Sequence, residues 1–292
     1  MIDTLHLGLS YSCNMKCKHC FVDKQKDNLD IDKLKKTIDY LDKNGLFFVI
    51  YTFGEPLLAK EFWNIAEYVS GKKIIQTLMT NGSLITKNNI KKLKKNHINN
   101  IYISLDSVHE VKHDLNRGYN GSFKRAINAF KLLQYDFNVG MAITVNDNNI
   151  NEMNEFVELA ERIGIKNISF LRQRENNSII KLSKKDEYEE FYIKYLCSDM
   201  KINILFHDPS LLKITNDLYR NNKIDLTIYE KYYDMNSCHY NTTLSIEPNG
   251  NVKHCNLINK NIGNINDNNI EKILKIGSEK NECISYCAKL SK

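Results

Sequence analysis

Three cysteines near the start of the chain have residue types and spacing suited to metal chemistry. Cys13, Cys17 and Cys20 stand in the run CNMKCKHC at residues 13–20, called the cysteine loop below. Thiolates select zinc or iron-sulfur clusters, and structural zinc normally takes four ligands, often as two CxxC-like pairs. Because only three thiols are local, the spacing suits a four-iron cluster whose fourth iron stays open to a chelating cofactor or substrate. The alternative is a chance grouping or part of a zinc site.

The chain between residue 5 and about residue 200 alternates short apolar runs with amphipathic stretches. This rhythm predicts repeated strand-helix units and a parallel sheet. Apolar residues at helical spacing, such as Leu34, Ile38 and Leu41, support the helices. The predicted strands are 4–11, 47–53, 73–79, 100–105, 138–144 and 167–171, and the predicted helices are 30–44, 58–70, 84–96, 122–134, 150–163 and 184–199. We therefore expect an α/β fold built as a partial, open (βα)6 TIM-type barrel.

After about residue 200 the strand-helix rhythm breaks. Residues 202–206 predict a short strand and residues 211–219 a further helix. Residues 243–255 predict a β-hairpin, because an Asn-Gly turn at Asn249 and Gly250 joins two apolar runs. We divide the chain into a core at 1–200, a connecting region at 201–236 and a small cysteine-rich β-hairpin/helix domain at 237–292.

Polar segments follow each of the first four predicted strands. The cysteine loop follows the first strand, Gly54 and Glu55 follow the second, and Asn81 follows the third, while Ser104 and Asp106 close the fourth. In parallel strand-helix folds the loops at the carboxyl ends of the strands share one face. These segments are therefore predicted to converge on one rim.

The cysteine loop resembles that of the radical S-adenosylmethionine (radical SAM) superfamily, whose CxxxCxxC pattern it matches in full. His19 fits the aromatic position that usually precedes the last cysteine in that family. The resemblance implies a [4Fe-4S] cluster held by Cys13, Cys17 and Cys20, with S-adenosylmethionine on the open iron. It also implies that reductive cleavage of this cofactor gives a 5'-deoxyadenosyl radical, which takes a hydrogen atom from the substrate.

The segment Gly54-Glu55-Pro56 resembles the GGEP-type segment of this family, which binds the amino group of the methionine moiety. A carboxylate beside bare glycine backbone suits the grip of an ammonium group at close range. Phe53 replaces the first glycine of the family pattern, so we expect a bulkier pocket wall. The alternative is a loop whose glutamate complements the dipole of the following helix.

Ser104, Asp106 and Arg117 resemble a later family segment that ends in an arginine before a Gly-Ser-Phe helix start. The resemblance makes Ser104 and Asp106 candidates for the ribose hydroxyls or the amino group, and Arg117 a candidate for the methionine carboxylate or the substrate. An aspartate and an arginine in one loop are also a common surface ion pair. Asn81 suits an ordinary turn before a helix as well.

Cys238 and Cys255, with Gly250 between them, resemble the opening signature of SPASM and Twitch domains. Such domains follow radical SAM cores and hold auxiliary [4Fe-4S] clusters. Only Cys283 and Cys287 follow in this chain. Because four thiolates suffice for one cluster, the resemblance implies a shortened, Twitch-like domain with one auxiliary [4Fe-4S] cluster. The same four cysteines could instead hold structural zinc.

The remaining cysteine, Cys197, lies in an amphipathic stretch where a buried free cysteine is ordinary packing. The sharper hypothesis makes it a catalytic hydrogen-atom donor to a substrate radical. The eight cysteines and the absence of a secretory-signal pattern at the start predict a reducing compartment, the cytoplasm. No apolar run reaches the roughly 18 residues of a membrane span. The net charge of +6 is mild, so we expect solvated lysine-rich faces and no nucleic acid partner.

The SPASM/Twitch resemblance implies a ribosomally synthesised peptide, with or without a leader peptide, as the substrate of crosslinking or epimerisation. It also implies a reductant such as flavodoxin or ferredoxin. Two other classes of function stay open at this point. One is a Twitch-type small-molecule dehydrogenase, and the other is a non-enzymatic zinc-binding module.

Overall fold

A computed structural model of the chain describes residues 1–175, 178–198, 201–236, 242–254 and 260–278. Its strands are β1 (Thr4–Gly8), β2 (Phe48–Thr52), β3 (Ile75–Thr80), β4 (Asn100–Ser104), β5 (Asn138–Val145), β6 (Asn167–Arg172), β7 (Arg174–Glu175), β8 (Ser178–Ile179), β9 (Asn203–His207), β10 (Thr243–Ile246), β11 (Asn251–Lys253) and β12 (Gly263–Asn264). The six predicted strands of the core correspond to β1 to β6.

The helices lie close to the predicted ranges as well. They are α1 (Ile31–Lys43), α2 (Phe62–Ser70), α3 (Lys87–Lys95), α4 (Glu110–Arg117), α5 (Ser122–Leu133), α6 (Met153–Arg162), α7 (Lys185–Leu196), α8 (Leu212–Arg220), α9 (Leu226–Asn236) and α10 (Ile270–Ser278). Short 3₁₀ turns are η1 (Pro56–Leu58), η2 (Ile150–Glu152) and η3 (Pro209–Leu211). Within the described ranges, no helix is both long enough and apolar enough to cross a membrane.

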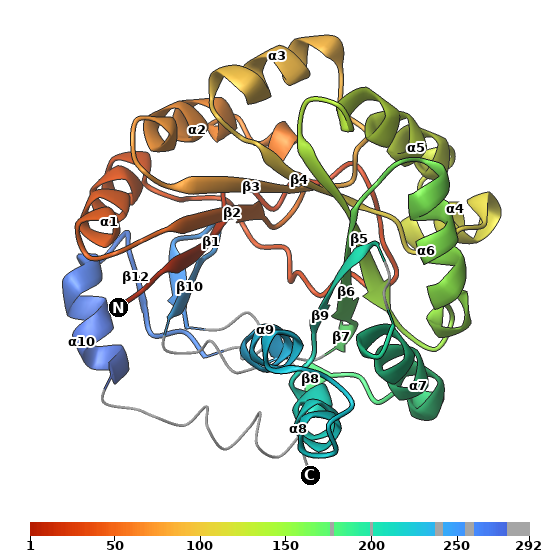
Figure 1. Cartoon of the computed structure of the whole chain (residues 1–292). Helices are drawn as coiled ribbons and strands as arrows, with labels where there is room; N and C mark the ends of the chain where they lie inside the picture. The colour runs from red at the N-terminus through yellow and green to blue at the C-terminus, as the bar shows by residue number, and fades with distance from the viewer. Residues whose placement is uncertain (176–177, 199–200, 237–241, 255–259, 279–292) are drawn as a thin grey trace.

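One curved sheet forms the wall of an open barrel, with helices on its outer side (Figure 1). Its strand order is β12-β11-β10-β1-β2-β3-β4-β5-β6-β9, and all neighbours from β10 to β9 are parallel. The carboxyl ends of these parallel strands therefore share one rim, as predicted. The α/β fold with a partial, TIM-type barrel is confirmed.

The sheet continues across both predicted domain boundaries. Strand β9, in the predicted connecting region, pairs with β6, and β10, in the predicted C-terminal domain, pairs with β1. The predicted hairpin is confirmed, because β10 pairs antiparallel with β11 and Gly250 has the positive φ of +83° that its turn requires. The extent of a separate C-terminal domain stays a prediction.

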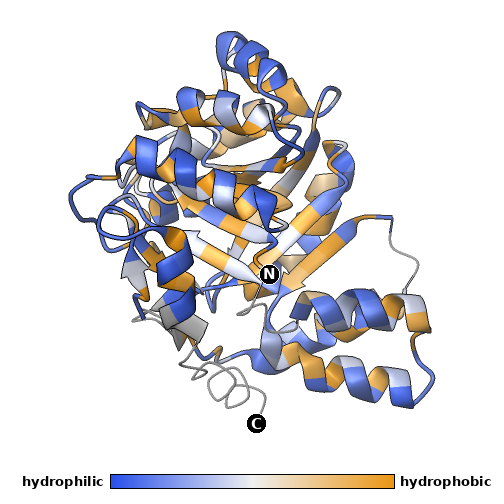
Figure 2. Ribbon diagram, turned by 90° about the vertical axis from the view of Figure 1, so that its left-hand side faces the viewer, coloured by the Kyte–Doolittle hydropathy of each residue, from blue (hydrophilic) through white to orange (hydrophobic). Residues whose placement is uncertain are grey.

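The hydrophobic core lies between the sheet and its helices. Leu5 and Leu7 of β1 are fully buried in one cluster with Leu34 and Ile38 of α1. Full burial of each such side chain contributes about 1.5–3 kcal/mol. Figure 2 shows hydrophobic residues along the strands and hydrophilic residues on much of the helix surface. This packing fixes the strands and, through them, the loops on the rim.

Helix α4 was predicted as a loop, and this prediction was wrong. Its apolar side chains point outward, since Val111 is 72% exposed and Leu115 is 61% exposed. Its inward face instead carries the buried His113 and Arg117. Hydrophobic periodicity detects a helix whose buried face is apolar. It fails here because the buried face of α4 is polar.

Among the described residues, side chains and no further strand cover the outer edge of β9. The Tyr195 hydroxyl accepts from the Ile204 amide at 2.9 Å, and the Tyr232 hydroxyl donates to the Ile204 carbonyl at 2.9 Å. Asn236 accepts from the Asp208 amide at 3.2 Å. An open strand edge is a template for pairing with another chain. Helix α9, which packs along β9 in Figure 1, therefore closes this edge.

Candidate functional site

The cysteine loop is attached to the carboxyl end of α4. The Lys16 amide donates to the Arg117 carbonyl at 3.1 Å, and the Lys18 amide donates to the Asn116 carbonyl at 2.9 Å. The last carbonyls of a helix have no partners inside it, so the loop satisfies two groups that would otherwise lack one. Gly118 ends the helix with φ +58°, and a Cβ there would lie 2.6 Å from the Lys16 carbonyl oxygen. This approach requires glycine.

The three thiols differ in exposure but lie within electrostatic reach of one another. Cys13 and Cys17 are half-buried, and Cys20 is exposed. Burial raises the pKa of the Cys13 and Cys17 thiols, and the nearby Cys20 adds to both shifts. A neighbouring positive charge on Arg117 opposes the shift of the Cys17 pKa. Ligation by a metal would have to overcome this cost of forming thiolates.

The donor set fits an iron-sulfur cluster better than a single ion. In the described part of the chain, no three His, Cys, Asp or Glu side chains gather closely enough to hold one metal ion. A four-iron cluster places each thiolate on a different iron, so its ligands do not converge on one point. Three partly accessible thiols on one short loop meet that requirement. They could therefore hold a cluster with one iron free of protein ligands.

Glu55 connects the carboxyl end of β2 to the carboxyl end of β3. Its carboxylate is buried, and it accepts from the Thr80 hydroxyl at 2.8 Å, the Asn81 amide at 2.8 Å and the Leu57 amide at 3.3 Å. Burial raises the pKa of Glu55, and these donors oppose that rise. The bond to Leu57 caps η1, so the alternative in which this glutamate serves a helix start is confirmed in part.

Asn81 links β3 to the cysteine loop. Its side-chain amide donates to Asn14 Oδ1 at 2.9 Å, and Asn14 in turn donates to Ser83 Oγ at 2.8 Å. Asn81 Oδ1 accepts from the Ser83 amide at 2.9 Å. Sequence reasoning did not select Asn14 or Ser83. The one feature that could have pointed to Asn14 is its position directly after Cys13 in the cysteine loop.

Gly54 allows the backbone that follows β2 to approach the segment that leads into the cysteine loop. Its φ is +45°, and a Cβ there would lie 2.4 Å from the Ser12 carbonyl oxygen and 2.6 Å from the Ser10 carbonyl oxygen. The next amide, that of Glu55, donates to the Ser12 carbonyl at 2.8 Å. Both contacts are to backbone atoms, which cannot rotate away. Gly54 thus sets the position of the loop.

Phe53, which replaces the first glycine of the family pattern, adopts φ +62°, a value unusual for a residue with a side chain. Its ring is buried and meets the Tyr11 ring edge to face, with centroids 6.5 Å apart. A Cβ on Gly8 would lie 2.7 Å from Phe53 Cδ2. The bulk expected at this position therefore packs over Gly8 and beside Tyr11.

Asp106 and Arg117 form a buried ion pair beside the cysteine loop. Arg117 Nη2 lies 2.6 Å from Asp106 Oδ2, and the two side chains are 9% and 0% exposed. The alternative of a surface ion pair is therefore wrong. Burial alone would raise the pKa of Asp106, but Arg117 and His19 lower it below its usual range. His19 Nε2 lies 3.3 Å from the same carboxylate oxygen.

The other predicted site residues lie in different environments. Ser104 is half-buried at the end of β4, on the strand face opposite the buried Ile101 and Ile103. Cys197 is exposed at the end of α7, before the amino end of β9, and thus at the edge opposite the cysteine loop. The buried-packing interpretation of Cys197 is wrong, and its place does not favour hydrogen donation. Outside the described residues lie Cys238, Cys255, Cys283 and Cys287.

His113 should make folding sensitive to mild acid. Its Nδ1 accepts from the Asp106 amide at 3.1 Å, which requires the neutral ring. Burial, aided by Arg117, lowers the pKa of His113 from 6.5 to about 4. The unfolded chain therefore binds this proton at a higher pH than the folded protein does. The contribution of His113 to the free energy of unfolding is complete above pH 6.5 and is lost as the pH falls toward 4. The loss between pH 7 and pH 5 is about 2 kcal/mol.

Urea unfolding of the wild type and of His113→Asn at both pH values measures this contribution, because asparagine offers an acceptor but does not titrate. The variant should lose less stability than the wild type on acidification. His97→Asn, at an exposed position, is the matched control. An identical pH dependence in the wild type and His113→Asn would contradict the assignment.

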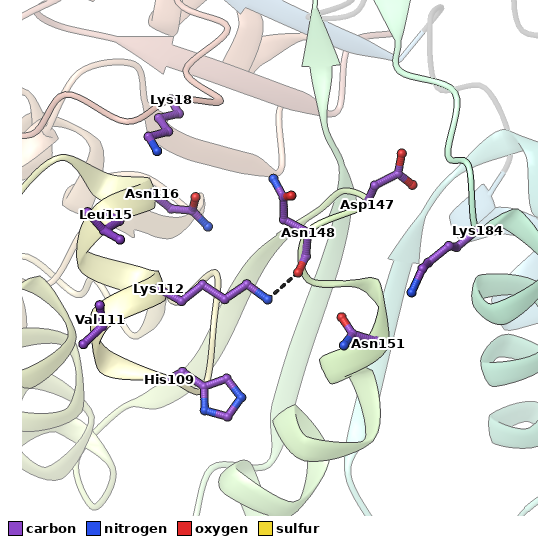
Figure 3. A pocket seen from close by; sticks show the side chains of 10 residues that line it. All are labelled: Lys18, His109, Val111, Lys112, Leu115, Asn116, Asp147, Asn148, Asn151 and Lys184. Carbon is purple, nitrogen blue, oxygen red and sulfur yellow. Dashed lines mark hydrogen bonds between the residues drawn. The ribbon is translucent and has the colours of Figure 1, made fainter.

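A cavity of about 700 Å³ lies beside the cysteine loop, between α4 and the loop that follows β5 (Figure 3). Lys18 of the cysteine loop and Asn116 of α4 line it, with Lys112 and Lys184 among the other residues. None of the predicted site residues lines this cavity. Lys112 is already held by the Asn148 carbonyl and by Glu152. The predicted rim and this cavity are therefore neighbouring but different features.

Comparison with protein families gives a match that includes the rim. A model of the radical SAM superfamily matches residues 8–160, just over half of the chain. This range contains the cysteine loop, Gly54, Glu55, Asn81 and Arg117. Membership of this superfamily implies a [4Fe-4S] cluster with S-adenosylmethionine. The three thiols of the cysteine loop fit such a cluster.

Two curated relatives and one solved structure indicate the range of similar proteins. The antilisterial bacteriocin subtilosin biosynthesis protein AlbA of Bacillus subtilis is 33% identical over 167 residues, covering 56% of this chain and 37% of AlbA. The Fe-coproporphyrin III synthase of Methanosarcina barkeri is 30% identical over 168 residues, covering 56% of this chain and 42% of the synthase. The chain thus matches less than half the length of each of these relatives.

The solved structure is that of Streptococcus suis SuiB bound to the precursor peptide SuiA. It superposes with a TM-score of 0.75 over 94% of this chain and 64% of SuiB, at 19% identity. At that identity the likeness establishes the fold alone.

Proposed function

The chain belongs to the radical SAM superfamily, and from that premise we propose that it generates a 5'-deoxyadenosyl radical to modify a substrate. We propose a ribosomally synthesised peptide as the substrate and crosslinking or epimerisation as the reaction. The observation that carries the proposal is the attachment of a three-thiol loop to the carboxyl rim of the barrel. The side chain of Asn81 and the end of α4 hold that loop, and the backbone of Gly54 packs against the segment that leads into it.

In this proposal each rim residue has a role that its contacts permit. Cys13, Cys17 and Cys20 hold the cluster. When bound, the cluster and S-adenosylmethionine supply an electron and the radical, which is chemistry that no side chain offers. Gly54 and Glu55 shape the wall for the methionine ammonium, while Ser104 and Asp106 remain candidates for the sugar and amino groups.

The peptide substrate is supported by the names of two similar proteins. AlbA takes part in the biosynthesis of a bacteriocin, and SuiB has been solved with a precursor peptide. A leader peptide is part of the same proposal. A small-molecule substrate is the second candidate, because the Fe-coproporphyrin III synthase matches the same share of this chain. We also propose a cytoplasmic location, because eight cysteines suit a reducing compartment. A flavodoxin or ferredoxin is the proposed reductant, because the proposed cleavage of S-adenosylmethionine needs one electron.

We also propose one auxiliary [4Fe-4S] cluster on Cys238, Cys255, Cys283 and Cys287. The hairpin that precedes Cys255 supports this, because it contacts the segments before and after the cysteine loop. Glu247, beyond β10, accepts from the Tyr11 hydroxyl at 3.4 Å. The Pro248 carbonyl accepts from the amides of Asn28 and Leu29, each at 3.1 Å.

Anaerobic reconstitution tests the proposed function. The purified chain should bind iron and sulfide, and with dithionite and S-adenosylmethionine it should release 5'-deoxyadenosine, measured by liquid chromatography and mass spectrometry. Protein that holds only zinc, or that never forms this nucleoside, would contradict radical chemistry. Candidate precursor peptides and coproporphyrins are then added in parallel. A mass change in one class of compound decides between the two substrates.

A further inference from the structure

We infer that Arg117 raises the reduction potential of the cluster by donating a hydrogen bond to the sulfur of Cys17. The inference rests on the proposed function, since it needs the cluster that this function requires. Arg117 would act on the cluster through Cys17, as a positioning residue that tunes the reduction potential, in addition to any contact with the cofactor. Arg117 Nη1 lies 3.7 Å from Cys17 Sγ, within hydrogen-bond reach of a sulfur acceptor.

The guanidinium is held in this orientation by Asp106. Nη2 lies 2.6 Å from the Asp106 carboxylate, which leaves Nη1 directed at Cys17. Nε is buried and has no hydrogen-bond partner among the described residues. Because a planar guanidinium donates from a rigid fork, fixing one nitrogen fixes the direction of the others. The geometry thus aims a permanent positive charge at one ligand sulfur.

Asp106 is itself fixed from several directions. Its Oδ1 accepts from the Thr144 amide at 3.0 Å, and its carbonyl accepts from the Asn149 side chain at 3.0 Å. Its own amide donates to His113 at 3.1 Å. An anchor of this kind reduces the freedom of Arg117 to leave Cys17. The backbone carbonyl of Arg117 also holds the cysteine loop, so charge and ligand move together.

The direction of the effect follows from electrostatics. Reduction adds one negative charge to the cluster, and a cation or hydrogen-bond donor near a ligand sulfur stabilises that charge. Asp106 opposes this, but its carboxylate stands behind the guanidinium. Removal of Arg117 should therefore lower the potential, whereas removal of the Asp106 charge should raise it. If Arg117 and Asp106 served only folding, their substitution would not shift the reduction potential in opposite directions.

A redox titration followed by electron paramagnetic resonance tests the inference on the full, reconstituted chain. The relevant signal is the one that Cys13→Ala lacks and that changes when S-adenosylmethionine is added. Arg117→Met should lower the midpoint potential by at least about 59 mV, a tenfold loss in the equilibrium for one-electron reduction. Arg117→Lys keeps the positive charge, so its midpoint potential should lie between those of the wild type and Arg117→Met. Arg162→Met removes an exposed arginine and should leave the potential unchanged.

The outcomes separate this inference from the proposed function. If the wild type takes up no cluster, the proposed function fails. If Arg117→Met holds full iron and sulfide with an unchanged potential, the function stands and the inference is overturned. Should Arg117→Met fail to take up iron, Asp106→Asn and Arg117→Lys still decide the matter. A higher potential in Asp106→Asn and a lower one in Arg117→Lys support the tuning role, and two unchanged potentials overturn it.

Discussion

Replacing Cys13, Cys17 or Cys20 with alanine is expected to reduce the iron bound after reconstitution by one cluster's worth and to abolish 5'-deoxyadenosine formation. Each substitution removes one of only three thiols on a short loop, which leaves two thiolates for a cluster that is proposed to need three. The loss of product should be at least about 100-fold, the upper end of the effects produced by residues that only support the ligands. Iron analysis and product quantification measure both effects.

Cys197→Ala is the matched control, because it makes the same chemical change at an exposed position on the opposite edge of the barrel. It should keep the full iron content. None of the three cysteines belongs to the hydrophobic core, so we expect each variant to fold, which circular dichroism and thermal unfolding can check. Full iron binding in all three loop variants would remove the basis for the cluster assignment.

Replacing Gly54 with alanine is expected to destabilise the fold strongly and to disturb the cysteine loop. Alanine at φ +45° costs about 1–2 kcal/mol from conformation alone. The new Cβ would also lie within 2.6 Å of two carbonyl oxygens, those of Ser12 and Ser10. Because neither contact can be relieved without moving the backbone, we expect a total loss of about 3 kcal/mol or more and poor uptake of iron.

Gly121→Ala isolates the effect of these contacts. Gly121 also has a positive φ, +80°, but a Cβ there would meet nothing within 4 Å. It should therefore lose only the conformational part, about 1–2 kcal/mol, and keep normal iron binding. Urea unfolding of the two variants gives the difference. Equal losses in both would show that the contact of Gly54 with the segment leading into the cysteine loop does not position that loop.

Most elements of the barrel could be predicted because their signal is local. Helix α1 has Leu34, Ile38 and Leu41 on one face, and each is buried. The polar-faced α4 could not be found in this way, because its inward face carries His113 and Arg117. The pairing of β10 with β1 could not be found either. It joins residues more than 230 positions apart, as in Leu5 and Leu244, and no local pattern records such a partner.

The sequence predicted several residues that the structure places on one rim, but it did not predict their contacts. Spacing selected the cysteines, and position after the strands selected Glu55, Asn81 and Asp106. The residues that fix them, including Thr80, Asn14 and His113, were not selected. Their side chains are common in turns and on helix faces, so their types carry little information. Only the fold brings them within hydrogen-bond distance.

The sequence by itself determined the number and spacing of the thiols, the order of strands and helices, and the placement of the polar segments after successive strands. These properties depend on residues close together in the chain. The tertiary structure alone decided that Arg117, 100 residues beyond Cys17, directs its guanidinium at that sulfur from a buried ion pair. The physical reason is that such a pair exists only when packing excludes water from both partners, and packing depends on the whole sheet. The cysteine spacing predicts the ligands of the proposed cluster, while the fold determines the charges around these thiols.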